Sequence, residues 1–154
     1  MSRSLSQRVL TMFGGLAFAG AFSLAQAAPV SIVVPLTGAQ EVPPVQTQGS
    51  GSAALTYDPS TRVVTWSITF GGLSSQATMA HFHGPAPAGK NAGVKVGISQ
   101  KGSPEVASPI SGQATLSPDD AKVFEAGEMY INIHTHYCPV KYQTNSIGYR
   151  WQAG

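Results

Sequence analysis

The chain has very few residues that could form disulfide bonds or carry charge. Among its 154 residues there is one cysteine, Cys138, and Asp, Glu, Lys and Arg together make up only 10%. A single cysteine cannot form an intramolecular disulfide. The basic residues form no cluster, so the charged footprint typical of nucleic-acid binding is missing and we expect no nucleic-acid partner. Stability must therefore come from a hydrophobic core, with a bound metal as a further contribution.

Long apolar runs are also scarce, and the one at the N-terminus has the features of an export signal. Arg3 and Arg8 precede a mostly apolar stretch at residues 9–24, and Ala25-Gln26-Ala27 follows it. This pattern predicts a signal peptide at residues 1–27 and one domain at residues 28–154, in a periplasmic or secreted protein with no membrane anchor after cleavage. The alternative is a retained anchor, although the apolar stretch is short for a membrane span.

The remaining composition is typical of an all-β protein. Val64, Trp66 and Ile68 alternate with polar residues, and the turn sequence at residues 58–61 precedes them, which predicts a hairpin with one buried face. We expect strands at residues 31–36, 52–57, 62–70, 76–83, 94–99, 110–116, 129–136 and 146–152. Ser117 and Gly127 flank one short helix with proline at its first position. The chain is therefore expected to form an all-β sandwich or barrel with one short helix.

All four histidines fall in two His-x-His pairs, His81-Phe82-His83 and His134-Thr135-His136. Alternate side chains of a strand point to the same face, so each pair presents two imidazoles from Cα atoms roughly 6.5 Å apart. If the two strands are neighbours, four imidazoles can converge on one ion, and such a site suits Cu, Zn, Ni or Fe. The alternative is two polar strand ends exposed to solvent.

The same alternation assigns neighbours to the histidine face. Met79 shares the face of the first pair, as a weak axial ligand or, more simply, a packing residue. Tyr130 and Asn132 share the face of the second pair, and with Tyr137 they are candidates to orient the imidazoles. Cys138 could be a metal ligand, a buried thiol or a reactive surface thiol.

Three stretches resemble the CHRD domain family, which is named for chordin. They are residues 36–45 (LTGAQEVPPV), 80–86 (AHFHGPA) and 130–135 (YINIHT). The chain is similar to the small exported bacterial members over nearly all of residues 28–154. One departure is Gly148, which stands where the family pattern has glutamate.

The resemblance implies an immunoglobulin-like antiparallel β-sandwich. The site positions of the family match His81, His83, His134 and Arg150 of this chain, whereas the assignment of His136 as a ligand depends on the spacing argument alone. The histidine pattern also looks like that of the copper-zinc superoxide dismutases, which implies a superoxide dismutase-like sandwich and site.

Copper is the first choice of ion, one per chain, because imidazole ligands bind it more tightly than other common divalent ions; zinc is the alternative. Such a centre could dismute superoxide as its small-molecule oxidant, with Arg150, backed by Lys141, guiding the anion. Arg150 could equally be a surface residue. Two other hypotheses stay open, a metal-buffering protein without turnover and a β-sandwich interaction module, and so does a homodimer.

Overall fold

The protein is described by a computed structural model that covers residues 27–99, 106–135 and, for the backbone, 147–150. Its strands are β1 (Val30–Thr37), β2 (Ser50–Asp58), β3 (Val63–Gly71), β4 (Ala77–His83), β5 (Val94–Gly97), β6 (Ile110–Thr115), β7 (Tyr130–Thr135) and β8 (Ile147–Arg150). One α-helix, α1 (Pro118–Glu125), and one 3-10 turn, η1 (Gly38–Gln40), complete the described elements. All the predicted strands and the helix are confirmed, with boundaries shifted by a few residues, while η1 was not predicted.

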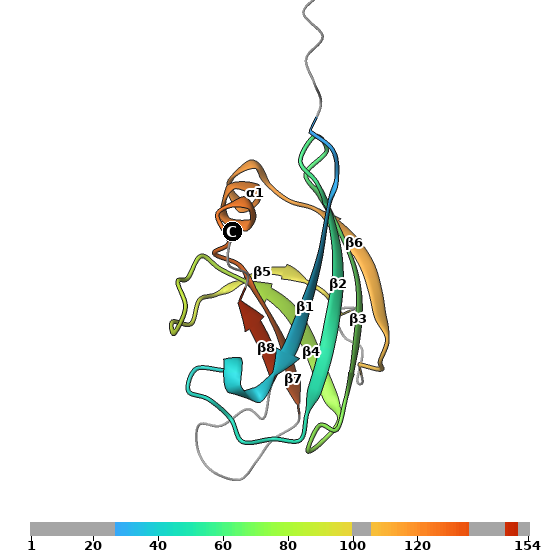
Figure 1. The fold of residues 1–154 in the computed structure, drawn as a ribbon, viewed down its shortest axis with the longest axis vertical. Coiled ribbons are helices and arrows are strands. Elements are labelled where there is room, and N and C mark those ends of the chain that lie inside the picture. Colours follow the sequence, from blue (N-terminus) through green and yellow to red (C-terminus); the bar gives the residue numbers. More distant parts are fainter. Residues whose placement is uncertain (1–26, 100–105, 136–146, 151–154) are drawn as a thin grey trace, which may run out of the picture.

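The strands form two antiparallel layers (Figure 1). One layer has the order β5-β4-β7-β8 and the other β1-β2-β3-β6. Among the described residues, the layers are joined at one edge by a single residue pair, Thr37 with Gly148. The all-β sandwich expected from the sequence is therefore confirmed.

The core lies between the two layers and is built by alternating residues of each strand. In β3, Val64, Trp66 and Ile68 are buried while the residues between them are exposed. The ring centroid of Trp66 lies 5.6 Å from that of Phe82 in β4, in an edge-on contact across the layers. Such aromatic contacts fix how the two layers face each other.

Helix α1 closes one end of the sandwich. The Ser117 side chain accepts a hydrogen bond from the backbone N–H of Asp120, and Pro118 opens the helix. At the other end Gly127 has a φ of 71°, and the backbone N–H of Glu128 donates to the carbonyl of Val123. This left-handed glycine cap ends the helix where the sequence predicted.

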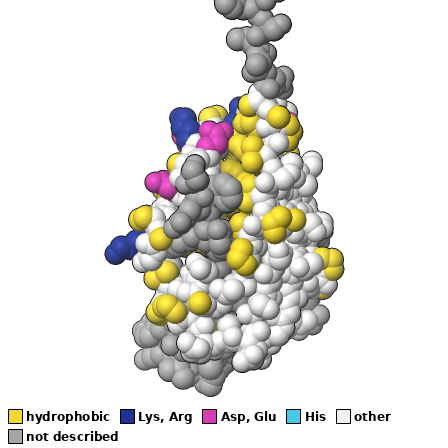
Figure 2. Space-filling view, in the orientation of Figure 1, with side chains coloured by type: hydrophobic (Ala, Val, Ile, Leu, Met, Phe, Trp, Pro, Cys, Tyr) yellow, Lys and Arg dark blue, Asp and Glu magenta, His cyan; other side chains and the backbone are white. Residues whose placement is uncertain are grey.

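The outer surface carries few charges on the face drawn in Figure 2, where hydrophobic side chains gather between α1 and β1. There an apolar groove is lined by Val30, Ile32, Tyr57, Pro59 and Phe124. Within the described ranges, no helix is both long and apolar enough to cross a membrane.

Candidate metal centre

Three of the four histidines meet on two neighbouring strands. In the antiparallel pairing of β4 with β7, Met79 faces His134, His81 faces Asn132 and His83 faces Tyr130. One ring nitrogen from each of His81, His83 and His134 lies within 4.8 Å of the others. The three ring centroids are 5.4 to 5.8 Å apart. This spacing allows the three nitrogen atoms to coordinate one ion after small side-chain rotations.

The histidines lie on the outer face of their layer. Ala80 and Phe82 of β4, with Ile131 and Ile133 of β7, are buried in the core. Residues between them point the other way, because side chains alternate along a strand. For His81, His83 and His134, the sequence prediction that the imidazoles lie opposite the apolar face is confirmed.

His83 is the most firmly held of the three. Its Nδ1 lies 3.0 Å from the carbonyl oxygen of Ala92, so Nδ1 carries the proton and donates it, and Nε2 keeps a free lone pair. The ring stacks on Tyr130 with centroids 5.1 Å apart and an interplanar angle of 13°. The Tyr130 hydroxyl in turn accepts from the Ala92 N–H at 2.9 Å. A backbone carbonyl behind an imidazole is the usual way proteins orient a metal-ligating histidine.

Two buried ring nitrogens of this cluster have no hydrogen-bond partner within the described part of the chain, Nδ1 of His81 and Nε2 of His83. A buried polar atom without a partner costs free energy, and a metal ion would satisfy both. The donor set also fits, since imidazole nitrogen suits copper and zinc better than magnesium or calcium.

The surroundings keep all three imidazoles neutral. Burial, followed by the charges of His81 and His83, lowers the pKa of His134 to about 4. Burial, followed by the charge of His83, also lowers the pKa of His81. For His83, burial lowers the pKa while the bond to Ala92 opposes this. At neutral pH the lone pairs are therefore available to a metal.

Glu41 is a neighbour of the centre to which the sequence reasoning gave no role. Both of its carboxylate oxygens accept from the side-chain amide of Asn132, at 3.1 and 3.0 Å. Asn132 is buried and lies opposite His81. Glu41 could have been singled out from the sequence, because it lies inside the 36–45 motif. The Ala92 carbonyl could not, since every residue has a backbone carbonyl.

The other predicted site residues have side chains that lie outside the described part of the chain. His136, Tyr137, Cys138 and Lys141 lie outside the described residues. Arg150 lies in β8, where its backbone pairs with Tyr130. Their roles stay predictions.

Comparison with known protein families gives a match. The family model described as CHRD domain matches residues 32–140, which include the three clustered histidines. No curated protein and no solved structure is significantly similar to the chain.

Proposed function

The chain belongs to the CHRD domain family, and from this premise we propose that it binds one copper ion through His81, His83 and His134 and acts as a redox enzyme of superoxide dismutase type. Zinc is the alternative ion. His136 is proposed as a fourth ligand.

The observation that carries the proposal is the pair of buried, unpartnered ring nitrogens on His81 and His83, next to a third imidazole. Structural histidines normally use both ring nitrogens in hydrogen bonds or expose them to water. Nδ1 of His83 is bonded to Ala92. Within the described residues, Nε2 of His83 and Nδ1 of His81 have no such partner and are left for a ligand that accepts lone pairs.

The copper ion, when bound, would supply one-electron chemistry, in which one superoxide is oxidised to dioxygen and a second, with two protons, is reduced to hydrogen peroxide. The chain's own residues have simpler tasks. His83 is fixed by Ala92 and Tyr130 and forms the closed end of the site. His81 and His134 are half-buried, which leaves room for a small oxidant to approach on their side. A coordination position left open for a small molecule is typical of catalytic rather than structural metal sites.

Export to the periplasm or outside the cell, after removal of residues 1–27, belongs to the same proposal, as does the guiding of superoxide by Arg150. An oxidising compartment permits both Cu(II) and Cu(I). A cation beside the site would raise the encounter rate with an anion.

The test is a copper titration followed by electron paramagnetic resonance, with superoxide decay recorded on the same sample. We expect one equivalent of nitrogen-ligated Cu(II) and accelerated decay. Tight binding without acceleration would instead indicate a metal-buffering protein, and absence of binding would leave an interaction module.

A double variant, His81→Gln with His134→Gln, tests whether the imidazoles share one ion. The single-site proposal predicts that bound copper falls close to zero, because only two of the four proposed imidazoles, His83 and His136, remain to hold it. Copper that fell only by half would contradict it. The matched control is His83→Gln alone, which should weaken binding and keep the stoichiometry.

A further inference from the structure

Met79 occupies a position beside the three histidines that its hydrophobic character does not explain. The side chain is 49% exposed, so packing is not its main role. It is the direct cross-strand partner of His134 and stands two residues before His81 on β4. Side chains directly opposite in an antiparallel pair have Cβ atoms about 5 Å apart, so the flexible thioether is within reach of the cluster.

Met79 lies on the same face of β4 as His81 and His83. Residues 79–83 alternate regularly, with Ala80 and Phe82 buried in the core, so Met79 points to the outer face with the histidines. The pairing of β4 with β7 shifts between Ala77 and Met79, and Ala77 is buried in the core. The extra residue therefore returns Ala77 to the core two residues before an outward-facing Met79. Bulges are common next to functional sites.

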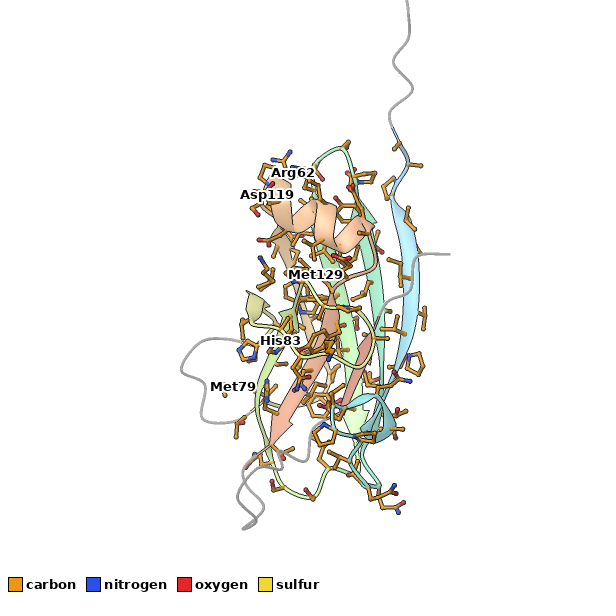
Figure 3. All side chains as sticks on the ribbon, turned by 90° about the vertical axis from the view of Figure 1, so that its left-hand side faces the viewer. Arg62, Met79, His83, Asp119 and Met129 are labelled. Atoms are coloured by element: carbon orange, nitrogen blue, oxygen red, sulfur yellow. The ribbon has the colours of Figure 1, made fainter. Side chains whose placement is uncertain are left out.

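The cluster is closed at one end and open at the other. His83 is 9% exposed and lies against Tyr130 and Ala92, whereas Met79 is half exposed. Both residues are labelled along β4 in Figure 3. The more exposed end of the cluster is therefore the end at which Met79 lies.

We infer that the Met79 thioether is an additional, outer ligand that selects Cu(I) at this site. The inference builds on the proposed metal function and specifies the oxidation state that the site favours. Thioether sulfur is a soft ligand that binds Cu(I) and its analogue Ag(I), and contributes little to Zn(II). Loss of the sulfur should thus weaken the binding of Cu(I) and Ag(I) and leave the binding of Zn(II) nearly unchanged.

The test compares Ag(I) and Zn(II) affinity by chelator competition, in chloride-free buffer. All proteins carry Cys138→Ser, so that no thiolate competes for silver. Met79→Leu should weaken Ag(I) binding about tenfold or more and change Zn(II) binding by less than about twofold, because only the soft ion uses the sulfur. The matched control Met129→Leu removes a thioether that is buried in the core, and both affinities should stay as in the parent.

Unchanged Ag(I) binding in Met79→Leu would overturn the inference. Equal losses for both ions would also overturn it, since they would indicate a structural effect. Methyl carbon-13 labelling of methionine gives a second readout, in which the signal missing in Met79→Leu should shift on adding one equivalent of Ag(I). If the Met79 inference is refuted but the parent protein binds Zn(II), the proposed three-histidine site is still supported. A parent that binds neither ion would refute both proposals.

Discussion

Removal of the Tyr130 hydroxyl tests whether the contacts behind His83 prepare it for a metal ion. The hydroxyl accepts from the Ala92 N–H at 2.9 Å and lies 3.3 Å from the Ala92 carbonyl, which itself accepts from His83 at 3.0 Å. Tyr130→Phe keeps the ring that stacks on His83 and removes these bonds. We expect a loss of about 1–3 kcal/mol in the free energy of unfolding, because the Ala92 N–H loses its partner in a half-buried place.

Metal affinity should fall in the same variant. Groups behind a metal-bound imidazole typically contribute about 10–100-fold to affinity. Since Tyr130 acts through Ala92 rather than on His83 directly, the lower end of that range, about tenfold, is expected. Urea unfolding measures the stability, and competition with a chromophoric chelator measures the affinity for Cu(II) and Zn(II).

The matched control is Tyr57→Phe. The Tyr57 hydroxyl donates to Glu125 of α1 at 2.7 Å, so its loss should lower stability and leave metal affinity unchanged. If Tyr130→Phe lost stability but bound metal as tightly as the parent, the idea that Ala92 and Tyr130 orient His83 would be refuted.

Three further predictions concern the frame and the titration of the site. Gly112→Ala should cost about 1–3 kcal/mol in urea unfolding, because a Cβ there would lie 2.8 Å from Cζ2 of Trp66; Gly71→Ala meets nothing within 4 Å, and an equal loss there would contradict the packing argument. Ser117→Ala should cost about 1 kcal/mol by removing the cap of α1, and unchanged unfolding would contradict the capping role. The metal-free protein should be most stable above about pH 6.5 and lose stability as the pH falls from there. The reason is that the unfolded chain takes up protons that the buried imidazoles resist, with the pKa of His134 at about 4. His134→Gln should flatten this acid-induced loss, measured by urea midpoints, and a variant as steep as the parent would refute the assignment.

Much of the frame could be predicted because its signals are local. Alternation in β3 identified its buried face, and Ser117, Pro118 and Gly127 bounded the helix. Each signal arises from a residue and its near neighbours in the chain, where strand geometry and capping chemistry act. The outward direction of His81 and His83 followed from the same alternation.

Contacts that join distant segments could not be predicted in this way. The Ala92 carbonyl reaches His83 from a loop, and Glu41 reaches Asn132 from 91 positions away in the chain. The bulge between Ala77 and Met79 depends on how β4 pairs with β7. Nothing in the residues of one strand reports the register of another.

The sequence by itself determined the family, the order of the strands along the chain and the face on which the histidines lie, because these depend on side-chain type and a period of two. Only the tertiary structure decided that β4 and β7 are neighbours and that His81, His83 and His134 come within 4.8 Å of one another. It also decided which ring nitrogens are bonded and which are left free. Those outcomes depend on strand pairing and burial, which arise only when the two layers pack around a common core.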